Sequence, residues 1–187
     1  MQTYNIEGNP IKNYVDKTNA KLKIKSVPEK TILEFPAFLT DFSQTFDAKW
    51  NTEDVFGRMD PIATYQGTKR TMSLGFDLPA GSLEEAKHNL EGCSELVKMV
   101  YPVYKKNILS KSPLVRIKFA NLITAEDADG LLGWISGLSW KPNLEMGMFA
   151  ANKEFYPKVV ALSFSFNILH EQTLSQDTIG SFPFGGK

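Results

Sequence analysis

Two stretches of this chain alternate strictly between apolar and polar residues, and they constrain the fold more than any other feature. In the first stretch the apolar positions are Met72, Leu74, Phe76 and Leu78. In the second stretch they are Val160, Leu162, Phe164, Phe166 and Ile168. A period of two is typical of a β-strand with one face buried and the other in contact with water. We therefore expect a sheet with one core side and one wet side.

Other patterns predict more strands of the same kind. Short β-prone runs lie at 22–25, 31–38, 38–49, 63–78, 114–124, 131–143 and 158–171. In the run at 131–143 the large residues share one parity, namely Leu132, Trp134, Leu138 and Trp140. Strands and helices do not alternate, which argues against a parallel βαβ sheet. The prediction is a mainly β protein, a β-sandwich or barrel of antiparallel strands.

One segment, at about residues 83–101, has the helical period instead. Ser82 followed by Glu85 forms a capping box at its start, and Pro102 ends it. Its apolar residues recur at spacings of three and four: Leu83, Ala86, Leu90, Cys93, Val97 and Val100. Gly92 lies inside and weakens the helix by about 1 kcal/mol relative to Ala. A single apolar stripe predicts one α-helix packed on the sheet.

Length and charge fit one domain. The 187 residues suffice for a proper core, which we place at 21–170 between a polar N-terminal arm (1–20) and a C-terminal tail (171–187). Lys plus Arg and Asp plus Glu are both 21, so the net charge is zero. That balance argues against a protein that binds nucleic acid or membranes through a basic patch. No signal peptide or membrane-spanning run is visible, so we expect synthesis and assembly in a cytoplasm.

The residues that usually carry chemistry are sparse. Cys93, the single cysteine, excludes an internal disulfide and is expected to be a small buried hydrophobe. His88 and His170 lie far apart in the sequence and offer little material for nucleophilic catalysis. The acidic groups around Asp54 and Asp127 lack the spacing of a calcium loop. The sequence therefore predicts no enzyme activity, no metal site and no cofactor.

The stretch from residue 50 to 65 has the composition of a contact surface. Its large apolar residues are Trp50, Phe56, Met59 and Tyr65, and its charged residues include Glu53, Asp54, Arg58 and Asp60. A polar loop has little reason to carry so many large apolar side chains unless they pack against something. Their partner is either the same subunit or another one.

The wet sides of the two alternating strands are also unusual. Their residues are Thr71, Ser73 and Asp77 on one strand and Ser163, Ser165 and Asn167 on the other. An ordinary exposed β-face carries Lys, Glu and Arg, whereas these side chains are short and rich in hydroxyl groups. Two interpretations are open: a wet but confined surface, such as the lining of a pore, or a plain sheet face in solvent.

Two segments resemble structural proteins of contractile-tailed bacteriophages. In VFGRMDPIATYQGTKRTMSLGFDLPA (55–80), a loop of the form Y/F-G-R-M-D-P-I leads into a strand of the form Q-x-T-x-R-T. The second segment, GLLGWISGLSWKPNLEMGMF (130–149) followed by FYPKVVALSFSFNILHE (155–171), resembles the closing hairpin of tail-tube-like baseplate proteins. Together the two segments cover about a third of the chain.

The resemblance implies the tail-tube fold, two packed antiparallel sheets flanked by a helix. Such proteins form six-fold rings in which each subunit contributes four strands to one barrel, and double-stranded DNA passes through the lumen without specific binding. The expected role is a tail-tube initiator or adaptor in the virion baseplate, between hub and tube proteins. Twenty-four strands about 4.8 Å apart give a barrel roughly 37 Å across, wide enough for a duplex.

Within this scheme the six short polar residues are expected to face the lumen, because they are wet and do not hold phosphates as Lys or Arg would. The expected contacts with the neighbouring subunit are Trp50, Phe56, Arg58, Met59, Asp60, Pro61 and Tyr65. Arg58 is expected to pair with an acidic residue across that contact.

Two alternatives are left open. The first is the major tail tube protein itself, which must stack on identical copies. The second, from a different class, is a β-sandwich that binds a small ligand or carbohydrate. It requires that Trp134, Trp140 and Phe149 be exposed and clustered.

Overall fold

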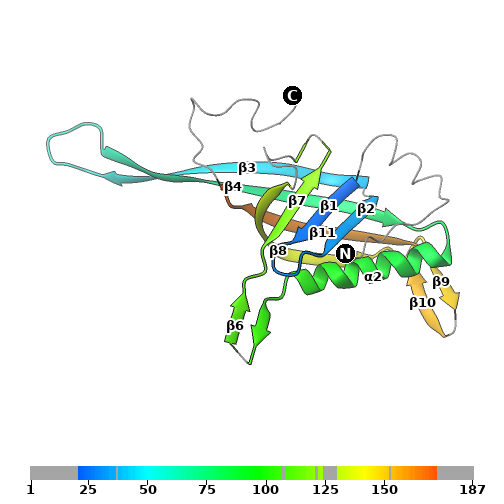
Figure 1. The fold of residues 1–187 in the computed structure, drawn as a ribbon. Coiled ribbons are helices and arrows are strands. Elements are labelled where there is room, and N and C mark those ends of the chain that lie inside the picture. The colour runs from blue at the N-terminus through cyan, green and yellow to red at the C-terminus, as the bar shows by residue number, and fades with distance from the viewer. Residues whose placement is uncertain are drawn as a thin grey trace.

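The computed structural model describes residues 21–36, 38–106, 108–120, 122–123, 130–151 and 153–171. This part of the chain is mainly β with a single helix, as predicted (Figure 1). The expected N-terminal arm, almost all of the expected C-terminal tail and the acidic segment around Asp127 lie outside the described residues.

Seven strands form one antiparallel sheet. In sheet order they are β2 (Ile32–Pro36), β1 (Lys21–Ser26), β7 (Val115–Phe119), β8 (Leu131–Pro142), β11 (Val159–Ile168), β4 (Ile62–Pro79) and β3 (Phe38–Glu53). The strands predicted from the alternating stretches are confirmed, since the even-numbered residues from 72 to 78 and from 160 to 168 are all buried.

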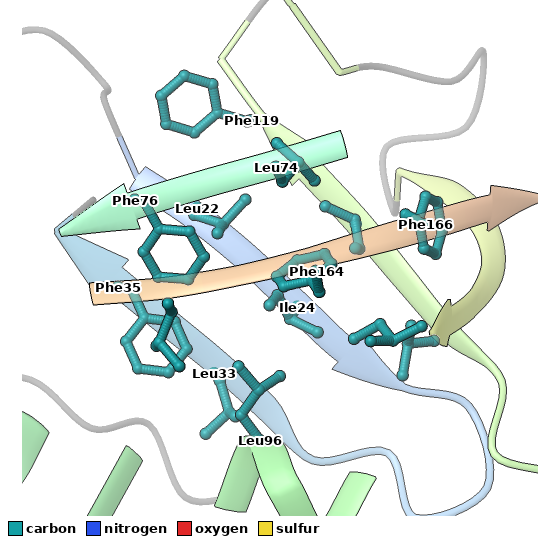
Figure 2. Packing of buried hydrophobic residues seen from close by; sticks show 14 of the residues in the cluster. Leu22, Ile24, Leu33, Phe35, Leu74, Phe76, Leu96, Phe119, Phe164 and Phe166 are labelled. Atoms are coloured by element: carbon teal, nitrogen blue, oxygen red, sulfur yellow. The ribbon is translucent and has the colours of Figure 1, made fainter. Parts of the chain in front are cut away.

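The sheet bends over itself and so forms two layers around one core. Its first three strands cross over β4 and β11 (Figure 1), and the rings of Phe35 on β2 and Phe76 on β4 are 6.0 Å apart although four strands separate β2 from β4. Phe76 also contacts Phe164 edge to face at 6.2 Å. Figure 2 shows these rings meeting in the interior with Leu22, Ile24 and Leu33. Each fully buried side chain of this size contributes about 1.5–3 kcal/mol.

Strand β8 joins the two layers, and a bulge divides it. Its first residues pair with β7, whereas the strand from Gly133 onward pairs with β11. Gly137 has φ +63° and lies at the bulge, where β8 carries one extra residue and its register with β11 shifts. Trp134 therefore lies opposite Asn167 on the wet side, while Trp140 lies opposite the buried Leu162. The expectation that these two tryptophans share one face is wrong, because one extra residue reverses the alternation.

Helix α2 (Leu83–Met99) packs on the sheet with a face that is rotated from the predicted stripe, although Ala86 and Cys93 are buried as predicted. The capping box is confirmed, since Glu85 N donates to Ser82 Oγ at 3.3 Å. The buried residues, however, are Glu85, Ala86, Asn89, Gly92, Cys93, Leu96 and Met99, whereas Val97 is exposed and Leu90 only half-buried. The reason is Gly92, where an added Cβ would lie 2.8 Å from Phe35 Cε1. Its bare backbone lets the helix rest on that ring.

Two small hairpins, which the sequence patterns did not predict, lie outside the main sheet. Strands β5 (Val103–Lys105) and β6 (Ile108–Lys111) follow the helix. Strands β9 (Met148–Ala151) and β10 (Glu154–Pro157) replace the expected irregular connection between the last two long strands. In Figure 1 they lie near opposite ends of α2.

Candidate functional site

The face of the sheet opposite the core carries a continuous polar surface over four adjacent strands, β8, β11, β4 and β3. Its central row consists of four serines, one per strand: Ser136, Ser165, Ser73 and Ser43. One flanking row contains Trp134, Asn167, Thr71 and Thr45, and the other contains Ser139, Ser163, Gly75 and Asp41. We call these twelve residues the polar wall.

The six residues expected to face a lumen all lie on this side of the sheet. Five of them belong to the polar wall, and Asp77 lies in the next row, opposite Ala161. They alternate with buried neighbours along both strands. The strand registers thus place these residues on one face of the sheet, because side chains of one parity project to one face.

Sequence reasoning missed the contributions of β3 and β8 to the polar wall. Ser43 and Thr45 have the spacing of two that could have identified them. Ser136 and Ser139 are three residues apart, and only the bulge at Gly137 brings both to the same face. That signal is not local to the strand, because it depends on the pairing of β8 with β11.

The polar wall is wet and weakly charged. None of its twelve residues is Lys or Arg, and Asp41 is its only carboxylate; in the next row of the same face, Lys141 and Asp77 lie on either side of Ala161. Asn167 Nδ2 donates to Ser136 Oγ at 2.9 Å, and Ser136 Oγ donates to the carbonyl oxygen of Ser165 at 3.4 Å. Most of these side chains are short, and some form hydrogen bonds with one another. Such a surface binds phosphate groups weakly, because phosphate groups bind chiefly to Lys and Arg.

Both edges of the four-stranded wall lack a strand partner in the part of the chain that the structure describes. β3 pairs only with β4, and β8 beyond Gly133 pairs only with β11. An unpaired edge presents a row of backbone N–H and C=O groups that can pair with another chain.

The second feature is the long hairpin of β3 and β4, which projects far beyond the body (Figure 1). Trp50 and Tyr65 belong to its strands and contact each other edge to face at 5.3 Å. The loop expected within the stretch 50–65 is therefore shorter than that stretch and spans only 54–61. Cross-strand pairing extends the hairpin because paired aromatic residues stabilise an antiparallel ribbon.

The hairpin tip is the most exposed apolar part of the described chain. Phe56 is fully exposed and Met59 is 98% exposed. The turn is closed by Arg58 N, which donates to the carbonyl oxygen of Val55 at 3.1 Å, and Gly57 supplies a φ of +85° that other residues rarely adopt. All seven residues expected at a subunit contact are exposed in the single chain. Within the described part of the chain, Trp50 and Tyr65 contact each other but all seven side chains still lie largely in solvent.

A buried arginine, which sequence reasoning missed, marks the base of the hairpin. Arg70 is 2% exposed and continues the core parity of β4. Its Nε and Nη2 both donate to Gln44 Oε1, at 3.0 and 2.7 Å, and its guanidinium lies over the ring of Phe46. Burial lowers the pKa of Arg70 to about 10. Arg70 thus ends the apolar core with a polar side chain at the base of the hairpin. The sequence signal that could have identified it is an Arg at a position where the alternation of β4 predicts a buried residue.

The other titratable groups do not form a reactive cluster. Burial raises the pKa of the Cys93 thiol to about 11, although Trp140 opposes this as a hydrogen-bond partner. Burial also lowers the pKa of His170, with the charge of Arg70 adding to the effect. Among the described residues, no three His, Cys, Asp or Glu side chains gather as a metal site would require. In the same part of the chain, α2 is too short and polar to span a membrane.

The aromatic residues considered for ligand binding do not meet on one surface. Trp134 is on the polar wall, whereas Trp140 is on the other side of β8, near Cys93 of the helix. Phe149 lies on β9, where Lys158 Nζ is 5.4 Å from its ring centroid.

No protein-family model matches the chain, and no curated protein matches it.

Proposed function

We propose that this protein is a virion structural protein that forms a six-fold ring in the tail or baseplate of a contractile-tailed phage. It acts there as a tail-tube initiator or as an adaptor between the baseplate hub and the tail tube, and DNA passes through its lumen. The protein assembles in the host cytoplasm and is not an enzyme. The observation that carries the proposal is the polar wall, which spans four adjacent strands and has two open edges.

The number of strands supports a shared barrel. A ring of six copies, each contributing β8, β11, β4 and β3, has 24 strands and a backbone diameter of at least roughly 37 Å at about 4.8 Å per strand. Closure needs one open edge on each side of the four strands, and the polar wall has both. Joining edge to edge also removes the unpaired backbone groups that otherwise invite uncontrolled association.

The chemistry of the wall supports passage of DNA. A duplex moving through a bore must not be held by ion pairs, and the polar wall carries no Lys or Arg. Helix α2 and the β1, β2 and β7 layer lie on the other side of the sheet, which becomes the outer side of the ring. The resemblance of segments 55–80, 130–149 and 155–171 to tail-tube-like proteins supports the same assembly.

The test is electron microscopy of the purified protein together with a DNA-retention assay. We expect six-fold rings that do not retain duplex DNA at about 0.1 M salt. In the variant Ser73→Lys/Ser165→Lys, rings should persist and retain DNA in a salt-dependent manner, because two lysines per subunit add twelve charges to the bore. The matched control, Glu84→Gln/Glu91→Gln on the exposed side of α2, changes the charge by the same amount per subunit and should form rings with at most weak retention.

Three outcomes would contradict parts of the proposal. A strictly monomeric protein at high concentration would exclude the ring. Unlimited polymerisation into tubes would favour the major tail tube protein over an initiator or adaptor. DNA retention by the control as strong as that by the wall variant would show that the polar wall does not line the bore.

A further inference from the structure

The β5–β6 hairpin has an exposed surface that the ring does not by itself explain. Tyr104, Ile108 and Leu109 are all more than half exposed, Ile108 at 72%. Lys105, Lys106 and Lys111 lie among them, and the segment 103–111 contains no acidic residue. It is therefore both apolar and basic, with a formal charge of +3.

The base of this hairpin is fixed to the body while its surface is open. Lys111 Nζ donates to the carbonyl oxygen of Pro28 at 2.9 Å. A two-stranded hairpin alone is only marginally stable in water, so a partner that covers its apolar side chains would stabilise it. Isolated exposed apolar residues are normal on a surface, but three on one short hairpin mark a contact site.

The tip of the β3–β4 hairpin has the complementary composition. Phe56 and Met59 are fully exposed, and Glu53, Asp54 and Asp60 outnumber Arg58, which gives a formal charge of −2. The tip and the β5–β6 hairpin lie far apart within one chain (Figure 1), so a single copy does not bring them together.

We propose that the tip of the β3–β4 hairpin docks on the β5–β6 hairpin of a second copy of this chain. Phe56 and Met59 pack on Tyr104, Ile108 and Leu109, while Asp54 and Asp60 face Lys105 and Lys106. Aromatic and methionine side chains surrounded by opposite charges are typical of interface cores with a polar rim. The inference rests on the proposed function for its partner, and it assigns the surface that receives the tip.

Because tip and receiving surface are different patches, the contact is head-to-tail. Such a contact propagates from copy to copy and yields a closed ring or a filament. It also changes the expectation for Arg58. Instead of pairing with a carboxylate, Arg58 is the one unfavourable charge of the tip, so Arg58→Glu should tighten association.

Charge reversal tests the docking. The variant Asp54→Lys/Asp60→Lys has a tip of charge +2, and Lys105→Glu/Lys106→Glu has a receiving surface of charge −1. Each variant alone should lose self-association by at least about tenfold in affinity, because like charges then face each other. An equimolar mixture should regain assemblies in which the two variants alternate, since every contact in the mixture again joins opposite charges.

Mass photometry with one variant labelled measures assembly size and composition. The control is Glu145→Lys/Glu154→Lys on the β9–β10 side, which carries the same charge change as the tip variant. It should assemble like the unmodified protein. Circular dichroism should show that all variants are folded. Two results would overturn the docking while leaving the ring intact. One is that both test variants assemble as well as the unmodified protein, and the other is that mixing the two variants restores no assembly. Weakening by Arg58→Glu would also overturn it. A monomeric unmodified protein would overturn both docking and ring.

Discussion

The two halves of the β3–β4 hairpin belong to the same strands but are stabilised differently. From Arg70 to Leu78, every second residue of β4 is buried against the second layer of the sheet and α2. From Ile62 to Lys69, β4 has no such layer, and nearly all its residues are exposed. Backbone pairing with β3 continues through both halves. The comparison shows that pairing alone maintains the hairpin, whereas packing supplies the stability of the body.

The largest expected effect separates the two halves directly. Phe76→Ala should lower the free energy of unfolding by about 3–5 kcal/mol, because it empties a fully buried ring site. Phe56→Ala should change it by less than about 0.5 kcal/mol, because that ring contacts solvent. Urea unfolding of a monomeric preparation measures both values. Equal losses would show that the tip is packed in the single chain.

The variant Gly92→Ala tests how closely α2 packs on the sheet in the body of the protein. Helix propensity alone predicts a gain of about 1 kcal/mol, but the new Cβ would lie 2.8 Å from Phe35 Cε1. We expect a net loss of about 1–3 kcal/mol, since the helix must move away from the sheet. The double variant Gly92→Ala/Phe35→Leu should lose less than the sum of its two parts. A stabilised Gly92→Ala would mean that α2 does not rest on Phe35.

The boundary between the halves can be tested at Arg70. Arg70→Met should cost about 1–2 kcal/mol because Gln44 Oε1 loses two hydrogen bonds, and adding Gln44→Leu should recover part of this. Burial lowers the pKa of Arg70 to about 10 in the folded chain, so the unfolded chain binds the proton more tightly and the Arg70 contribution to stability rises with pH only above about 10. Between about pH 8 and 9 the difference between Arg70→Met and the unmodified protein should be constant, because His170, whose pKa the Arg70 charge also lowers, is neutral there. A change within that range would contradict this assignment.

The smallest expected effect concerns the projecting half. A double-mutant cycle with Trp50→Ala and Tyr65→Ala should give a coupling energy of about 0.5–1.5 kcal/mol, as for other edge-to-face aromatic pairs. Because this region can open without the body, hydrogen exchange of nearby amides is the sensitive measurement. Faster exchange near Trp50 with unchanged exchange near Phe76 is expected. Equal acceleration in both halves would show that they unfold as one unit.

Much of the fold and half of the candidate site could be predicted from the sequence. The parity of Thr71, Ser73, Ser165 and Asn167 follows from an unbroken period of two, and their strands pair in the register that this parity needs. The capping box at Ser82 is equally local, since its two residues, Ser82 and Glu85, are only three positions apart. The sequence could not supply Ser136 and Ser139, because their common face depends on a bulge in β8.

The sequence by itself determined which side of β4 and β11 is buried and where α2 begins, because alternation and capping act within a few residues. Tertiary structure decided which face of α2 is buried, through the contact between Gly92 and Phe35. It also decided that β8 changes parity at Gly137 and that Trp50 and Tyr65 extend a hairpin rather than a loop. These outcomes depend on close approach and strand register between residues far apart in the chain, which no local period encodes.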